Sequence, residues 1–71
     1  MEMNEKIDIL AELFDRDAEE IKPETNLDEL GWDSMTMLSV IAMAKTRFNK
    51  TITGAQIRGF LRVQGILNEM E

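Results

Sequence analysis

Apolar and polar positions near the start of the chain alternate with the period of a helix. Asn4 is a residue type that caps helices, and it precedes a pattern that predicts a helix from about Glu5 to Phe14. The apolar stripe of this segment consists of Ile7, Leu10, Leu13 and Phe14. Because a helix with one apolar face must bury it, we expect the stripe to face the core.

The helical pattern stops between Asp15 and Asp33. This long connection contains the only proline of the chain, Pro23, and the glycine Gly31. Such a connection in a compact domain is usually functional or has structure of its own. We expect its apolar residues to anchor it to the core: Ile21, Leu27, Leu30 and Trp32.

The strongest helical pattern begins at Asp33 and Ser34 and continues to about Asn49. Asp33 or Ser34 can accept a hydrogen bond from the free amides of the first turn, as helix N-caps do. The face expected to be buried consists of Met37, Ile41, Ala44 and Phe48. Further apolar residues lie beside or away from this face: Met35, Leu38, Val40 and Ala42. The helix is therefore apolar over a wider arc than a core contact requires.

The pattern weakens after Ile52. The segment from Thr53 to Gly59 predicts one short, mobile helix, since each of its glycines disfavours a helix by about 1 kcal/mol relative to alanine. A last amphipathic helix to the C-terminus is predicted by Leu61, Val63, Ile66, Leu67 and Met70. The expected fold is all-α: a small bundle of three main helices and one short helix, with a long ordered loop between the first two. We expect residues 1–71 to form a single domain.

Composition narrows the chemistry, because the chain has no cysteine and no histidine. Disulfides, the usual zinc sites, thiol catalysis and imidazole-activated hydroxyls are therefore excluded. A helical chain of 71 residues also leaves little room for an enclosed cleft of about 300 Å³. These features favour a protein that is not itself a catalyst.

Charge is divided unequally along the chain. Residues 1–33 contain 12 Asp and Glu against 3 Lys and Arg, whereas residues 34–71 contain 2 against 5. The acidic half is a poor surface for nucleic acid. No apolar run approaches the roughly 18 residues of a membrane span, and no basic segment followed by an apolar stretch opens the chain, so we expect no secretory signal and a cytoplasmic protein. Nothing in the sequence implies an oligomer, so a monomer is expected.

Residues 27–35 have the sequence Leu-Asp-Glu-Leu-Gly-Trp-Asp-Ser-Met. With the long loop before it and the apolar helix after it, this segment resembles the Leu-Gly-x-Asp-Ser-Leu signature of the acyl carrier protein family. Met35 replaces the commoner leucine. The resemblance extends over nearly the whole chain: residues 21–27 are similar to the family's first loop, and Phe48, Val63 and Gln64 fall where the family has the same residues.

The resemblance implies that Ser34 receives 4′-phosphopantetheine from coenzyme A through a phosphopantetheinyl transferase, and that Asp33 helps this enzyme to hold its metal ion. A phosphodiester at this position would lie beside unpaired amides and the positive end of the helix dipole. Gly31 is expected to reduce bulk behind the serine. The arm ends in a thiol, which the chain itself lacks.

By the same resemblance, the chain is an acyl carrier protein of fatty-acid, polyketide or related lipid biosynthesis. Its further partners are an acyl- or aminoacyl-loading ligase and a synthase or acyltransferase. The docking surface implied for these enzymes lies on the second helix and consists of Met35, Leu38, Ser39, Ala42, Lys45 and Thr46. The alternative for its apolar members is that they meet the first loop in the core.

One departure from the family concerns charge. Its members usually present acidic residues along the second helix, whereas this chain has Ser39, Lys45, Thr46 and Arg47 there. A generic basic partner would be repelled. The hypothesis that follows is a specialised carrier with a dedicated synthase or ligase.

Two other functions remain open at this stage. An aminoacyl, D-alanyl or peptidyl carrier would use the same arm for a different cargo, and the triplet from Asp33 to Met35 also suits the D-alanyl group. A helical adaptor would use Ser34 only as a helix cap and would bind partners through Met35, Leu38 and Ala42.

Overall fold

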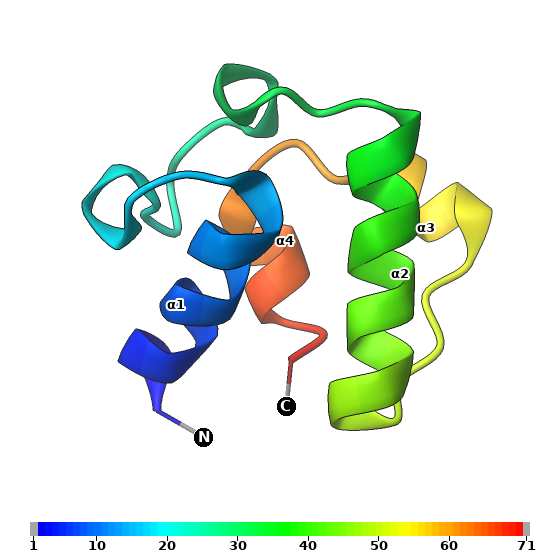
Figure 1. Ribbon diagram of the computed structural model, residues 1–71. Coiled ribbons are helices and arrows are strands. Elements are labelled where there is room, and N and C mark those ends of the chain that lie inside the picture. The colour runs from blue at the N-terminus through cyan, green and yellow to red at the C-terminus, as the bar shows by residue number, and fades with distance from the viewer. Residues whose placement is uncertain (1, 71) are drawn as a thin grey trace.

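The computed structural model describes residues 2–70, which form four α-helices and two short 3-10 helices (Figure 1). The elements in chain order are α1 (Met3–Phe14), η1 (Ala18–Glu20), η2 (Leu27–Leu30), α2 (Ser34–Phe48), α3 (Gly54–Gly59) and α4 (Val63–Leu67). Within residues 2–70 no strand occurs. The predicted all-α bundle is confirmed, and the expected long loop between its first two helices contains η1 and η2.

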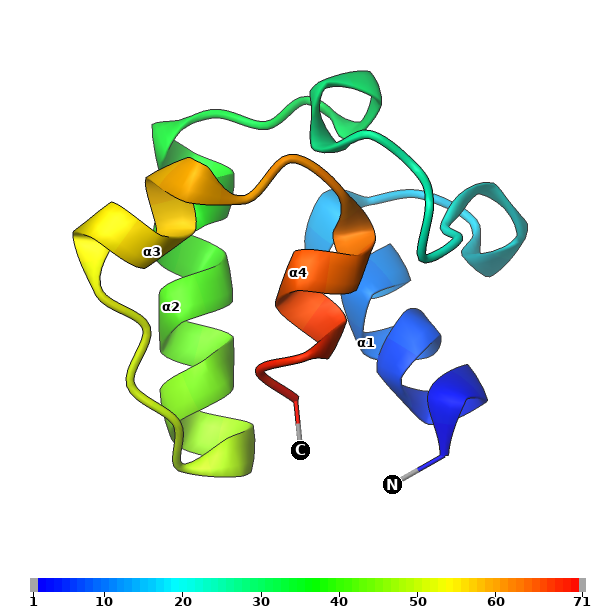
Figure 2. The ribbon, with the colours of Figure 1, turned by 180° about the vertical axis from the view of Figure 1, so that it is seen from behind.

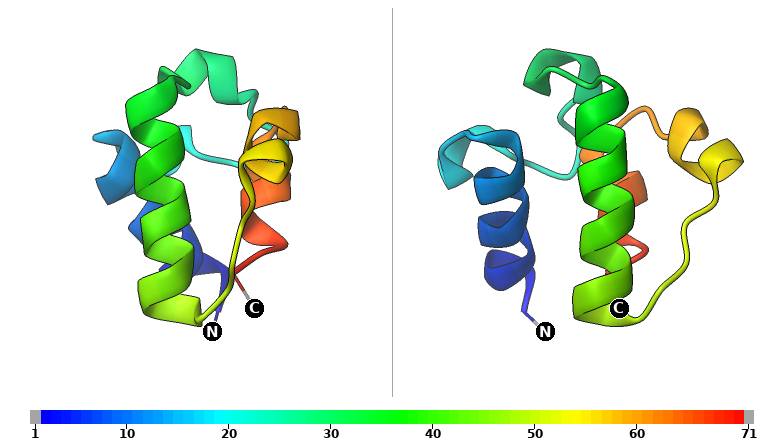
Figure 3. Two further views of the ribbon diagram at one scale, coloured as in Figure 1. Left: turned by 90° about the vertical axis from the view of Figure 1, so that its right-hand side faces the viewer. Right: turned by 45° about the vertical axis from the view of Figure 1, so that its right-hand side comes forward.

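The helices α1 and α2 stand on either side of α4, as Figure 1 and the reverse view in Figure 2 both show. The short helix α3 lies beside α2, away from α1 (Figure 3). The long connection crosses the end of the bundle at which α2 begins. Among the described helices, none is long and apolar enough to cross a membrane.

The long connection is anchored to the core as predicted. Ile21, Leu27 and Leu30 are buried there. Trp32 is half-buried and packs on Phe14 of α1, with 6.1 Å between the ring centroids and 45° between the ring planes. The apolar residues of this irregular segment therefore attach the loop to the core, and Trp32 attaches it to α1.

The start of α1 differs from the prediction. The helix begins at Met3, and its N-cap is Glu2, whose carbonyl accepts hydrogen bonds from the amides of Glu5 and Lys6. Asn4 therefore lies inside the first turn, and the prediction that it caps the helix was wrong. The Glu2 carbonyl already accepts from the Lys6 amide, one of the two that an Asn4 cap would have served.

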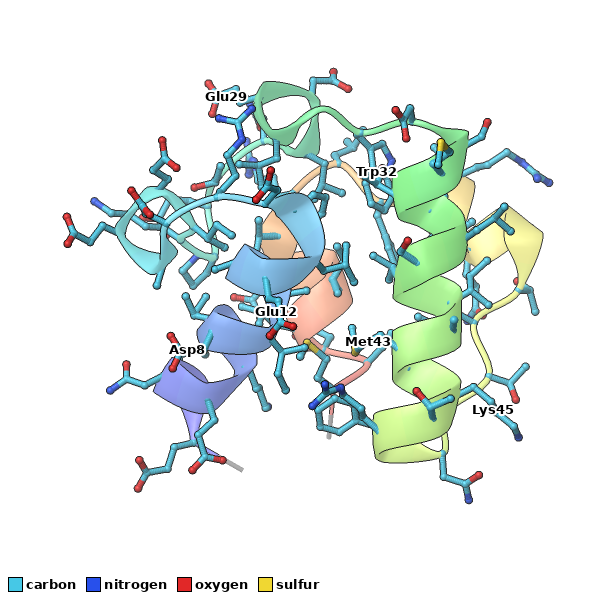
Figure 4. The ribbon with its side chains drawn as sticks, in the orientation of Figure 1. Asp8, Glu12, Glu29, Trp32, Met43 and Lys45 are labelled. Carbon is cyan, nitrogen blue, oxygen red and sulfur yellow. The ribbon has the colours of Figure 1, made fainter. Side chains whose placement is uncertain are left out.

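The buried face of α2 is rotated from the predicted one. Val40, Met43 and Ala44 are buried, whereas the expected core residues Met37, Ile41 and Phe48 are only half-buried. Val40 is fully buried, although the pattern placed it outside the core face. The helix α2 contacts both α1 and α3. The side chain of its residue Met43 points toward α1 (Figure 4). Packing against two neighbours moves the centre of the buried face.

The last helix, α4, is shorter than its apolar pattern predicts. It ends at Leu67, and Leu61 lies before it with 79% of its surface exposed. The backbone of residues 61–64 pairs with that of residues 23–27: the amide of Leu27 donates to the carbonyl of Leu61 at 3.0 Å, and the amide of Val63 donates to Thr25 at 3.0 Å. This pairing holds the segment extended and keeps Leu61 out of the helix. The other apolar residues of the pattern are buried as expected: Val63, Ile66, Leu67 and Met70.

The short helix α3 occupies the segment in which it was predicted. Thr53 caps it by accepting from the amide of Gln56 at 3.1 Å, and the side chain of Gln56 accepts from the amide of Thr53 at 2.8 Å. Ile57 is its buried residue. The mobility expected of this segment stays a prediction.

Candidate functional site

A reciprocal pair of hydrogen bonds fixes the start of α2. The carboxylate of Asp33 accepts from the amide of Thr36, and the amide of Asp33 donates to the Thr36 hydroxyl, both at 2.9 Å. The sequence allowed either Asp33 or Ser34 as the N-cap of α2, and the structure shows that it is Asp33. Thr36 was not predicted to take part, because the familiar form of this motif has Glu or Gln at the third helical position.

Ser34 is the first residue of α2 and is exposed. The capping hydrogen bonds run between Asp33 and Thr36, so the Ser34 hydroxyl is not used to cap the helix. The next residue, Met35, is 77% exposed. The hydroxyl therefore lies at an open corner of the bundle, where another protein can reach it.

The turn before the cap depends on Gly31, but not for the reason that the sequence suggested. Gly31 has φ of 78°, a left-handed conformation that residues with a side chain rarely adopt. A Cβ at this position would meet nothing within 4 Å, so removal of bulk is not the reason for the glycine. The backbone conformation requires it instead. The Gly31 carbonyl lies 3.4 Å from the Thr36 hydroxyl, whose nearest acceptor is the Asp33 carbonyl at 2.9 Å.

Trp32 lies between this turn and α1. Figure 4 shows its ring directed into the space between the start of α2 and α1, where it meets Phe14. Trp32 thereby fixes the position of the turn relative to the core. The start of α2 is thus stabilised by the hydrogen bonds of its cap and by the contact between Trp32 and Phe14.

The cap also determines the charge beside Ser34. The pKa of Asp33 is lowered, chiefly because its carboxylate accepts the backbone N–H of Thr36. Asp33 is therefore ionised at neutral pH. Since the carboxylate occupies the Thr36 amide, fewer amides are free to face a phosphodiester than the sequence suggested.

The docking residues named from the sequence share one exposed face of α2. Successive residues of a helix are turned by about 100°, so residues 34, 35, 38, 39, 42, 45 and 46 fall within an arc of about 140°. Met35 and Leu38 are 77% and 66% exposed, and the other docking residues are exposed as well: Ser39, Ala42, Lys45 and Thr46. Ser34 is exposed on the same arc. The alternative that Met35, Leu38 and Ala42 meet the first loop in the core is thereby excluded.

The sequence of this chain matches a family of known proteins. The family described as "Phosphopantetheine attachment site" matches residues 7–67. The chain belongs to this family. No curated protein and no solved structure gave a significant match. The resemblance to acyl carrier proteins is thus confirmed at the level of the carrier domain.

Membership of the phosphopantetheine attachment family establishes the cofactor. The carrier domain bears a covalently attached 4′-phosphopantetheine on a serine. Domains of this family work with a phosphopantetheinyl transferase and with synthases, and they are generally carriers and not catalysts. The adaptor that uses its serine only as a cap is therefore set aside.

The residues of this chain fit such a group at Ser34. A covalent phosphodiester needs a hydroxyl that is accessible and free of other duties, and Ser34 is exposed and outside the cap. The chain has one other serine, Ser39. Its hydroxyl donates to the carbonyl of Met35 at 3.0 Å, one turn back within α2.

Proposed function

We propose that Ser34 bears the phosphopantetheine arm. We further propose that residues 1–71 form a single carrier domain, which is cytoplasmic and monomeric. It would hold acyl intermediates as thioesters for fatty-acid, polyketide or related lipid biosynthesis. The observation that carries the proposal is the exposed Ser34 hydroxyl, left free by the Asp33–Thr36 cap at the start of α2. The arm supplies the thiol, because the chain has no cysteine.

Attachment of the arm joins the Ser34 oxygen to the phosphorus of coenzyme A that carries the pantetheine. The bond from this phosphorus to the rest of the diphosphate breaks, adenosine 3′,5′-bisphosphate leaves, and the serine proton passes to a base of the transferase. Asp33 is ionised and adjacent to Ser34, so its carboxylate can serve as a ligand to the metal ion that the transferase brings.

The exposed face of α2 would receive the partner enzymes. Met35 and Leu38 project from the same arc of the helix as Ser34, so an enzyme that reaches the arm also covers these apolar side chains. The partners proposed are the transferase, a loading ligase, and a synthase or acyltransferase. The remaining residues proposed for this surface are Ser39, Ala42, Lys45 and Thr46.

The attachment site can be tested with the two serines as a matched pair. Wild-type protein, S34A and S39A are incubated with coenzyme A and a broad-range phosphopantetheinyl transferase, and intact masses are recorded. Wild type and S39A are expected to gain one phosphopantetheine, and S34A none. Both substitutions lie on the exposed face of α2, so equal circular dichroism spectra serve as the folding control. Modification of S34A, or no modification of the wild type, would refute the proposal.

The cargo can be assigned after the arm is attached. The holo protein is offered in parallel to ligases that activate fatty acids and to ligases that activate amino acids, including D-alanine. Acylation by the first group supports the acyl carrier function. Charging by an aminoacyl-activating ligase alone would instead favour the aminoacyl or D-alanyl carrier that the Asp33-Ser34-Met35 triplet also suits.

A further inference from the structure

Charge divides the surface of the molecule into two regions. Residues 34–68 contain no Asp or Glu and include five basic residues: Lys45, Arg47, Lys50, Arg58 and Arg62. All five are exposed. Seven of the twelve acidic residues of the first half lie on α1, η1 and η2, and the right-hand view of Figure 3 shows α1 and η1 on the side of α2 opposite α3. The charged residues of α2 and α3 themselves are thus all basic, although Asp28 of η2 lines a groove with Leu61 and Arg62 just after α3.

The exposed face of α2 is apolar near Ser34 and basic at its far end. Ser34, Leu38 and Lys45 are spaced so that they lie within about 40° of one another around the helix axis. Figure 4 shows Lys45 on the side of α2 away from α1, next to the segment that leads to α3. Arg47 is not part of this face, because it lines a groove with Ile9 and Leu13 of α1.

The short helix α3, which lies beside α2, carries a second exposed cation. Arg58 lies in its last turn and is exposed, and its guanidinium folds back toward Gly54. Leu61 follows α3 and is 79% exposed, a large apolar side chain close in sequence to Arg58. Residues 34–68 hold no Asp or Glu that could pair with Lys45 or Arg58.

The sign of the charge changes at Ser34. Asp33 precedes the serine, and Asp28 and Glu29 lie on η2 before it, whereas only cations follow it along α2 and α3. A partner that covers Ser34 thus meets negative charge on one side and positive charge on the other. Electrostatic complementarity of this kind orients a partner and increases its association rate more than its affinity.

Resting on the proposed function, we infer that the phosphopantetheinyl transferase of the same organism docks on α2 and α3 through a site of complementary chemistry. The centre of the transferase's site is apolar, and carboxylates at its edge receive Lys45 and Arg58. Met35 and Leu38 fill the apolar centre. A basic edge at that place would repel both cations.

The test measures KM and kcat for arm transfer by the organism's own transferase. The carriers compared are wild type, the neutral variant K45Q/R58Q, the reversed variant K45E/R58E, and K22E as a control. Lys22 is also exposed but lies in the acidic half. The KM of K45E/R58E is expected to rise roughly fivefold or more at low salt, with kcat unchanged and K45Q/R58Q between the two. Added salt should reduce the difference, and K22E should keep a KM close to that of the wild type.

Two outcomes would overturn the inference while leaving the proposed function intact. A KM of K45E/R58E equal to that of the wild type would show that these cations are not at the interface. A lower KM would show that the partner's edge is basic. Absence of any mass gain on wild-type protein would refute the proposed function itself. Circular dichroism of each variant confirms folding.

Discussion

At the scale of single residues, the site depends on a division of roles between two neighbours. Asp33 accepts the Thr36 amide and caps α2, which leaves the Ser34 hydroxyl exposed at the first helical position. If Ser34 were the cap, its oxygen would be engaged with the helix and would be a poorer acceptor of the arm. The order of the Asp-Ser pair is therefore what makes the hydroxyl available.

The Asp33 cap should make stability depend on pH. Its pKa is lowered in the folded chain because the ionised carboxylate accepts the Thr36 N–H, so the cap stabilises the fold above the ordinary pKa of an aspartate. This contribution is lost as the pH falls through the lowered pKa. In D33N the side-chain carbonyl still caps the helix and does not titrate there. Melting temperatures of both proteins from about pH 6 to about pH 2 should show wild type losing stability relative to D33N. Parallel curves would contradict this account.

At the scale of elements, α3 depends on its cap more than the longer helices do. It has 6 residues and includes two glycines, and helices of this length are not stable on their own. The reciprocal bonds of Thr53 and Gln56 pair amides that the short helix would otherwise leave free. The burial of Ile57 then attaches the helix to the core.

Removal of the α3 cap should loosen this helix. T53A is expected to lower the free energy of unfolding by about 1 kcal/mol and to speed amide exchange at Gln56 and Ile57. T51A is the matched control, because Thr51 is exposed and lies outside α3. Urea denaturation and hydrogen exchange by NMR measure the two effects. Equal behaviour of T53A and T51A would show that the cap does not stabilise α3.

At the scale of the whole molecule, one small core joins α1, α2, α4 and the long loop. A chain of this size typically has only about 3–5 kcal/mol of net stability. The segment before α4 is held by backbone pairing with residues 23–27, including the hydrogen bond from the Gln64 amide to the Pro23 carbonyl at 2.9 Å. The loop and the C-terminal segment therefore stabilise each other.

Two leucines of the same apolar pattern should differ sharply in their effect on stability. Leu67 is 2% exposed, so L67A should cost about 2–5 kcal/mol and leave much of the protein unfolded. Leu61 is largely exposed, so L61A should change stability by no more than about 0.5 kcal/mol. Urea titrations followed by circular dichroism measure both values. Comparable losses in the two variants would place Leu61 in the core and contradict the structure.

The sequence by itself determined the helical class, the place of the long loop and the start of α2. These features depend on local causes: the spacing of apolar residues, the position of Pro23, and the preference of Asp33 for a helix cap. The motif around Ser34 also indicated the phosphopantetheine family. Local signals of this kind act over one or two helical turns and can be recognised in the chain.

Only the tertiary structure decided which apolar residues are buried. Val40 is buried and Leu61 is exposed, against the expectation from helical periodicity. Helical periodicity shows which residues lie on an apolar face. The elements that pack against the helix determine which part of this face is buried. The position of α1 against α2 turned the buried face of α2. The hydrogen bonds between residues 23–27 and 61–64 ended the last helix early, because they join segments that are far apart in the sequence.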